Sequence, residues 1–193
     1  MANMNERRWD REDTHGSFLI STQLNLLDHA FINGAFSTDE MYWASPLPED
    51  QLALTLSQSV TMGLYEVQPA AAPPATAEEP SSPRTPSPTL EASPQETLVQ
   101  IGLARLITDH VTCAYLTDVY VSPTHRGLGL AKWLIACVRE LLQAHPALRR
   151  ALLFTGSAKL KDLYTSELGF HDMKDEGGGI IVMSRRAYTA DGT

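Results

Sequence analysis

The residues best suited to chemistry lie between Tyr115 and Gln143, where a short polar turn joins two apolar segments. The apolar, β-branched run from Tyr115 to Val121 predicts a strand, and Ser122-Pro123 ends it. Gly127 and Gly129 follow in the turn, and a long amphipathic run after them predicts a helix. A strand, a glycine turn and a helix in this order direct free backbone N–H groups at an anion. The segment therefore predicts a site for a phosphate-bearing cofactor.

The composition is that of a globular protein. The 193 residues fit one medium domain, and a hydrophobic fraction of 43% is ordinary. A formal net charge of −8 argues against a nucleic-acid-binding surface, which is normally basic. No apolar stretch approaches the roughly 18 residues of a membrane span, and the charged N-terminus lacks the apolar core of a signal peptide. We expect a soluble, cytoplasmic protein with no nucleic-acid or membrane partner.

The two cysteines, Cys113 and Cys137, do not suggest a metal site or a disulfide. Two cysteines without clustered histidines cannot form a tetrahedral zinc site, so no metal is expected. We interpret both as buried, reduced thiols that pack as small apolar side chains, and neither is placed to act as a nucleophile.

The part of the chain before residue 68 predicts helices and strands. Residues 1–16 are polar and aperiodic, which predicts a flexible tail. Strands are predicted at 17–22 and 60–67, with helices over 24–36 and 48–56 between them.

The composition changes sharply over residues 68–96. This segment holds eight of the twelve prolines and no aromatic residue, so it cannot bury enough apolar surface to offset its ordering entropy. We predict a disordered insertion in a hairpin that pairs 60–67 with 98–108. About thirty extra loop residues cost only roughly 2 kcal/mol of closure entropy, which one domain can absorb. That domain is expected to span 17–184, with a C-terminal tail over 185–193.

The remaining pattern completes an α/β (α+β) arrangement. Antiparallel hairpins and βαβ crossovers are both implied, so we expect a mixed, mostly antiparallel sheet of about seven strands with helices on both faces. The further predicted elements are strands at 112–121 and 151–155, a helix over 158–168 that Gly169 ends, and a final strand pair at 170–173 and 180–184.

Two motifs in this order resemble the GNAT N-acetyltransferase superfamily. Residues 126–131 (RGLGLA) fit the family signature (Gln/Arg)-x-x-Gly-x-(Gly/Ala), and residues 163–170 (LYTSELGF) resemble the second landmark, LYxxxGF, with one extra residue. A Walker loop needs Lys-Ser/Thr after its last glycine, which Gly129 lacks. A dinucleotide fingerprint needs a third glycine where this chain has Lys132.

The resemblance implies a GNAT-like fold and acetyl-CoA as co-substrate. The strand residues Val119, Tyr120 and Val121 would splay from a neighbour at a β-bulge and offer main-chain groups to the pantetheine arm. The pyrophosphate would lie on N–H groups of the glycine loop and the helix start, which are those of Arg126, Gly127, Leu128, Gly129, Leu130 and Ala131.

The resemblance also suggests catalytic residues. Tyr164 aligns with the tyrosine that serves many GNAT enzymes as general acid, protonating the departing CoA thiolate. An amine must lose a proton before it attacks, but the motifs fix no general base. Asp118, on the bulged strand, is our candidate, and Asp39 and Glu40 are alternatives.

Tyr42 and Trp43 fall where this family builds its acceptor pocket. Aromatic walls there would hold an amine by cation–π contact, although ordinary core packing explains the same residues.

These features predict an acetyl-CoA-dependent N-acetyltransferase in which the acceptor amine attacks the thioester directly. The acceptor is a small-molecule or peptide amine, and the protein is a monomer or a homodimer. One alternative is a CoA-binding module without catalysis that uses the proline-rich insertion to recruit a partner. Another is an acyltransferase that uses a different acyl donor.

Overall fold

The computed structural model describes residues 6–69, 96–175 and 183. The chain divides into two compact units, Met1–Phe154 and Thr155–Thr193. The described part of the first unit holds a sheet and three α-helices. That of the second holds the helix α4 (Ala158–Leu168) and the 3₁₀ turn η5 (Met173–Asp175).

Six strands form one sheet within the described residues, and neighbours along the chain are neighbours in the sheet. The strands from β1 to β5 pair antiparallel, whereas β5 and β6 pair parallel. A parallel pair needs a crossover connection, and the helix α3 supplies it. The strands are β1 (Arg8–Asp13), β2 (Gly16–Ser21), β3 (Val60–Gln68), β4 (Thr97–Thr108), β5 (Cys113–Val121) and β6 (Arg150–Leu153).

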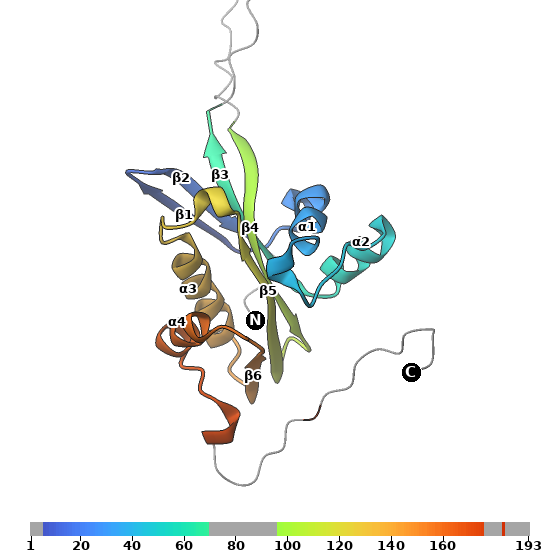
Figure 1. Cartoon of the computed structure of the whole chain (residues 1–193), viewed down its shortest axis with the longest axis vertical. Helices are drawn as coiled ribbons and strands as arrows, with labels where there is room; N and C mark the ends of the chain where they lie inside the picture. Colours follow the sequence, from blue (N-terminus) through green and yellow to red (C-terminus); the bar gives the residue numbers. More distant parts are fainter. Residues whose placement is uncertain (1–5, 70–95, 176–182, 184–193) are drawn as a thin grey trace, which may run out of the picture. The chain divides into compact units, whose positions relative to one another are not determined.

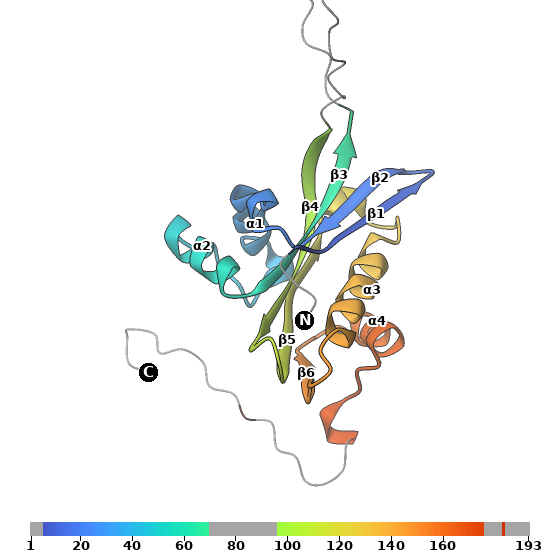
Figure 2. The ribbon, with the colours of Figure 1, turned by 180° about the vertical axis from the view of Figure 1, so that it is seen from behind.

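Helices lie on both sides of this sheet. Figures 1 and 2 show α1 and α2 on one side and α3 on the other. The mixed, mostly antiparallel sheet with helices on both faces is thus confirmed. The helical elements of the first unit are α1 (His29–Phe36), α2 (Glu49–Ser57), α3 (Leu130–Gln143) and the 3₁₀ turns η2 (Leu24–Leu26), η3 (Asp39–Met41) and η4 (Pro123–His125).

Each side has its own apolar contacts. The buried residues of α3 recur at helical intervals, which gives this helix one apolar face to place on the sheet. On the opposite side, a core cluster joins α1 and α2 to β4. Its members are Leu27, Ile32, Ala35, Phe36, Met41, Leu52, Leu56 and Leu103.

Two predictions for the N-terminal part are wrong. Residues 8–13, which the sequence assigned to a flexible tail, form β1 and pair with β2. This edge strand exposes or half-exposes every residue, so its sequence lacks the apolar alternation that marks a strand. The helix predicted over 24–36 is interrupted, because Asp28 caps a new start and accepts hydrogen bonds from Ala30 N and Phe31 N.

The predicted strand at 170–173 is also wrong. Within the described residues, this segment is irregular up to the start of η5. Its predicted partner at 180–184 lies outside the described residues apart from Met183, as does the tail at 185–193.

The hairpin around the proline-rich segment is confirmed. β3 and β4 pair antiparallel from Val60 opposite Leu106 to Gln68 opposite Thr97. Residues 70–95 lie outside the described residues, and the disorder of the insertion stays a prediction.

The centre of the sheet contains a tight contact within β3. Tyr65 is 1% exposed, and a Cβ atom placed on Gly63 would lie 2.1 Å from the Tyr65 hydroxyl oxygen. The two residues are two apart on one strand and therefore share a face. Glycine at position 63 thus gives the buried ring of Tyr65 its space.

Replacing Gly63 with alanine should lower the free energy of unfolding by about 1–3 kcal/mol, because an added methyl overpacks a buried site. Gly34→Ala is the matched control. It lies in α1 with nothing within 4 Å of its added Cβ, so it should be neutral or stabilise by up to about 1 kcal/mol. Urea unfolding of both variants measures the difference, and equal midpoints would contradict this packing.

Candidate functional site

The glycine turn has the backbone conformation that its sequence suggested. After β5 ends at Val121, the chain passes through η4 and reaches Gly127 with φ 82° and Gly129 with φ 72°. This left-handed region costs other residues roughly 1–2 kcal/mol, so glycine at both positions fits the turn. Gly129 is the N-cap of α3, and its carbonyl accepts a hydrogen bond from Trp133 N at 3.1 Å.

The loop and the helix start present free N–H groups. Within the part of the chain that the structure describes, the N–H groups of residues 127–131 have no hydrogen-bond acceptor. A Cβ atom on Gly127 would meet nothing within 4 Å, so the space beside the loop is open. Unpaired donors at a helix N-terminus are suited to a phosphate, and the residues present fit a diphosphate group.

The side chain of Arg126 is engaged elsewhere. Its Nη1 donates to Glu40 Oε1 at 2.8 Å, its Nη2 pairs with Glu40 Oε2, and its Nε donates to the Val121 carbonyl at 3.0 Å. The hydrogen bond from Arg126 lowers the pKa of Glu40, and the same contact raises the pKa of Arg126. Arg126 therefore links the glycine loop to η3, near the predicted acceptor residues.

The strand before the loop carries the bulge that the family resemblance implied. Leu103 faces Tyr120, but Arg105 faces Thr117, so the register between β4 and β5 shifts. Asp118 lies in this bulge with φ 54°.

Beyond the bulge, one side of β5 is open. β6 pairs with Cys113–Leu116 only. Within the described residues, the stretch from Thr117 to Val121 has no partner strand on the β6 side. The predicted residues Val119, Tyr120 and Val121 thus lie where β5 continues past the end of its parallel neighbour β6.

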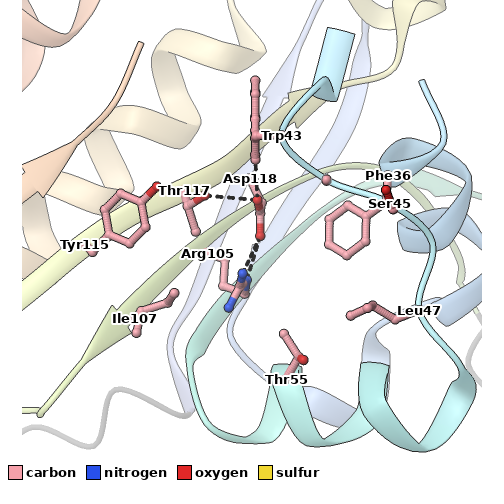
Figure 3. A pocket seen from close by; sticks show the side chains of 11 residues that line it. Phe36, Trp43, Ser45, Leu47, Thr55, Arg105, Ile107, Tyr115, Thr117 and Asp118 are labelled. Carbon is pink, nitrogen blue, oxygen red and sulfur yellow. Dashed lines mark hydrogen bonds and ion pairs between the residues drawn. The ribbon is translucent and has the colours of Figure 1, made fainter. Parts of the chain in front are cut away.

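The carboxylate of Asp118 is buried and fully engaged. Its side chain is 4% exposed, and Oδ2 accepts from Arg105 Nε at 2.7 Å. Oδ1 accepts from Trp43 Nε1 at 3.1 Å and from Thr117 Oγ1 at 3.0 Å. Figure 3 shows these partners converging on Asp118 from two strands and a loop.

A pocket of about 250 Å³ opens beside this carboxylate. Trp43 is half-exposed and lines it, whereas Tyr42 is not among the lining residues and contacts Trp43 edge-on with ring centroids 5.0 Å apart. The lining comes from α1, the loop after η3, α2, β4 and β5. It consists of Phe36, Trp43, Ala44, Ser45, Leu47, Thr55, Arg105, Ile107, Tyr115, Thr117 and Asp118 (Figure 3).

Sequence reasoning missed Arg105, the partner of Asp118. A signal was present, because Arg105 is the single charged residue in the otherwise apolar run of β4. A charge in a buried strand usually requires a partner.

Tyr164 lies in the second unit, on α4. Ser157 caps this helix by accepting from Leu160 N at 3.3 Å, and Gly169 ends it with φ 71°. Tyr164 is buried, and this burial raises the pKa of its phenol.

The two cysteines differ. Cys137 is buried on α3, and burial raises the pKa of its thiol to about 12. The expectation of burial is wrong for Cys113, which is exposed at the start of β5. Among the described residues, no three His, Cys, Asp or Glu side chains are grouped so that they could hold a metal ion. No helix among those residues is long and apolar enough to cross a membrane.

Comparison with known proteins identifies the family. Residues 66–170 match the sequence model of the acetyltransferase (GNAT) family. A protein of Gibberella zeae, provisionally named an acetyltransferase, is 38% identical over 165 residues, which are 86% of this chain and 85% of that protein. The chain belongs to the GNAT acetyltransferase family.

Solved structures agree with this assignment. A GNAT-family protein of Xanthomonas campestris pv. campestris, also provisionally named an acetyltransferase, has 27% identity and a TM-score of 0.52, with 80% of this chain and 84% of that chain covered. A Deinococcus radiodurans protein with 18% identity and a TM-score of 0.51 covers 88% of this chain and 87% of its own, and it supports the fold alone. The α+β GNAT fold is thus confirmed, and GNAT enzymes transfer an acetyl group from acetyl-CoA to amines.

Removing the charge of Asp118 should destabilise this GNAT protein by about 3 kcal/mol, because Arg105 would remain as a buried, unpaired charge. The double variant Arg105→Met/Asp118→Asn removes both charges and should lose less than Asp118→Asn alone. Urea unfolding of the wild type, Asp118→Asn and the double variant measures the three free energies of unfolding.

Asp10→Asn provides the matched control. Asp10 pairs with Arg8, and both side chains are more than half exposed, so its loss should change the free energy of unfolding by less than about 1 kcal/mol. If Asp118→Asn were as mild as Asp10→Asn, the buried pair would not stabilise the fold.

Proposed function

We propose that this protein is an acetyl-CoA-dependent N-acetyltransferase in which an acceptor amine attacks the thioester directly. One observation carries the proposal. A strand that has no partner strand beyond its β-bulge leads through η4 into a glycine turn whose N–H groups at residues 127–131 have no acceptor, both within the described residues. Such a loop suits a diphosphate, and an open strand edge suits an amide-containing arm. Family membership supports the same reading.

The proposed binding groups for acetyl-CoA are mostly main-chain atoms. N–H groups from Gly127 to Ala131 would hold the pyrophosphate, including those of Leu128 and Leu130, whereas that of Arg126 donates to the Pro123 carbonyl at 3.4 Å. The edge formed by Val119, Tyr120 and Val121 would hold the pantetheine arm and donate a hydrogen bond to the thioester carbonyl. The guanidinium of Arg126 is already paired with Glu40, so backbone donors would carry most of the phosphate recognition.

Tyr164 is the proposed general acid. Bound acetyl-CoA supplies an activated acetyl group, and its departing thiolate needs little help because a free thiol has a pKa near 8.5. A phenol whose pKa is raised by burial stays protonated at neutral pH and can donate to the sulfur. Its contribution should therefore be modest.

Asp118 is the proposed proton acceptor. It lines the pocket, whereas Glu40 is bound to Arg126. To take a proton from the acceptor ammonium, Asp118 would have to give up a hydrogen bond, and the one from Thr117 is the weakest held because a hydroxyl can rotate. The aromatic side of the acceptor site would be Trp43, with Tyr42 behind it.

A second candidate is a CoA-binding module without turnover. Both oxygens of Asp118 accept hydrogen bonds in this structure, which leaves no free base in the pocket and favours this reading. An acyltransferase that prefers another donor is a further option. All three would bind CoA, so only turnover separates them.

The purified protein should release free CoA when incubated with acetyl-CoA and at least one member of an amine panel. Gly127→Ala should raise the Kd for acetyl-CoA at least about tenfold, because a methyl would enter the open space beside the loop. A thiol reagent follows CoA release and calorimetry gives Kd. Parallel assays with propionyl- and succinyl-CoA test donor choice.

Gly16→Ala is the matched control for backbone strain. Gly16 also has a positive φ, 135°, but is the first residue of β2, paired with Asp13 of β1. It should lose stability and keep the affinity for acetyl-CoA. Tight binding without turnover of any amine would favour the module. If the protein does not bind acetyl-CoA even at millimolar concentration, all three proposals are wrong.

Tyr164→Phe should lower kcat by about 10²-fold or less and leave the Kd for acetyl-CoA unchanged, because only proton donation is lost. Tyr65→Phe is its control. Tyr65 is buried, and among the described residues its hydroxyl has no hydrogen-bond partner, so kcat should not change. If Tyr164→Phe keeps the full kcat, Tyr164 serves only to pack α4.

A further inference from the structure

The pocket beside Asp118, which we propose as the acceptor site, is lined by residues whose charges cancel. Among its lining residues, the charged ones are Arg105 and Asp118, and they pair with each other. The other polar groups of the lining are neutral hydroxyls and the Trp43 indole. The wall therefore offers no spare carboxylate to a polycation such as a polyamine.

The pair leaves unused hydrogen-bond donors and no unused acceptors. A guanidinium has five N–H groups. Those of Arg105 at Nε and Nη2 reach Asp118 Oδ2, both at 2.7 Å, and within the described part of the chain Nη1 has no partner. Both Asp118 oxygens are already acceptors, towards Arg105, Trp43 and Thr117. The N–H groups of Arg105 that point away from Asp118, which we call its outer edge, therefore have no anionic partner in the pocket.

The pair also fixes the position of those donors. The Arg105 side chain is 13% exposed and is anchored by the nearly buried Asp118, so its outer edge is held in the pocket rather than in bulk solvent. Figure 3 shows Asp118 on one side of the guanidinium, while the pocket continues towards Thr55 and Ile107 on the other. A planar guanidinium held in this way is suited to a carboxylate, which it can bind with two parallel hydrogen bonds.

The volume of the pocket suits a small acceptor. About 250 Å³ is below the range of roughly 300–1,000 Å³ found for sites of drug-sized ligands. A small molecule of the size of an amino acid fits within this space, whereas a multi-ring amine would extend out of it into solvent.

We propose that the acceptor is a small amine that also bears a carboxylate, of the amino-acid class, and that Arg105 binds the carboxylate. The inference rests on the proposed N-acetyltransferase function. A zwitterion adds no net charge to a wall that is itself neutral, and its ammonium group lies within reach of the aromatic Trp43 and Tyr115. A phosphate is less suitable, because its second negative charge would lie close to Asp118.

Matched acceptors test this inference. Amino acids are compared with the amines that lack only the carboxylate: glycine with methylamine, L-leucine with isopentylamine, L-phenylalanine with phenethylamine and L-lysine with cadaverine. For at least one pair, the wild-type kcat/KM should be about tenfold or more higher for the amino acid. A comparison of kcat/KM for β-alanine and O-phosphoethanolamine shows whether the enzyme prefers a carboxylate or a phosphate, and we expect β-alanine to be preferred.

Variants assign the preference to Arg105. Arg105→Lys keeps a charge beside Asp118 but loses the planar fork, and its preference for the carboxylate should fall at least threefold. Arg105→Met/Asp118→Asn removes the pair without leaving an unpaired charge. Because it also removes the proposed proton acceptor, its preference is measured by calorimetry as the ratio of the Kd values of the two acceptors, and this preference should disappear. Each ratio compares two acceptors on one variant, so a loss of kcat common to both cancels. Arg8→Met, at an exposed pair with Asp10, should keep the wild-type ratio.

The outcomes separate this inference from the function on which it rests. If the wild type acetylates cadaverine or phenethylamine better than every amino acid, the N-acetyltransferase stands and the inference falls. It also falls if O-phosphoethanolamine is preferred or if the double variant keeps the ratio. If no amine is acetylated, calorimetry measures whether the same amino acids bind to the protein, and this result tests the carboxylate site. Binding that Arg105→Lys weakens supports the carboxylate site, and no binding overturns it.

Discussion

The buried ion pair between Asp118 and Arg105 is the contact on which the rest of this site depends. Withdrawing two charges from water costs several kcal/mol per ion, so such a pair persists only with good geometry and further hydrogen bonds. Trp43 and Thr117 supply those bonds. Together, these partners hold Asp118 at a positive φ, a backbone conformation that is unfavourable for this residue. The pair therefore joins the bulged part of β5 to β4 and forms part of the wall of the pocket.

The bulge explains how one strand serves two binding regions. The start of β5 pairs with β6, its bulged middle lines the pocket, and its end leads through η4 into the glycine loop. β6 stops at Leu153, opposite Leu116, so the strand is open where the bulge begins. An acyl group held along this edge would lie between the loop and the pocket. The order of elements along β5 thus matches the order of the donor and acceptor sites that we propose.

Local patterns predicted much of this arrangement. The glycine loop, its helix and the hairpin around the proline-rich segment all follow from periodicity and composition. β1 was not predicted because its half-buried positions are Trp9, Arg11 and Asp13, so its sequence shows no apolar alternation. The partners of Asp118 were not predicted, because they depend on the register between β4 and β5 and on a loop 75 residues away along the chain. Only the isolated charge of Arg105 in an apolar strand signalled them.

The first residue of the glycine motif has a role that the motif alone does not reveal. Arg126 binds Glu40 and the Val121 carbonyl, so its guanidinium joins η3 to the end of β5. Three residues after Glu40, Trp43 is bound to Asp118. The loop that walls the pocket is thereby attached at both the glycine turn and the bulge. A phosphate that drew Arg126 away would have to displace a carboxylate, whereas the free N–H groups of residues 127–131 require no such exchange. This difference favours backbone donors, which glycine leaves accessible, over the Arg126 side chain in the diphosphate site that we propose.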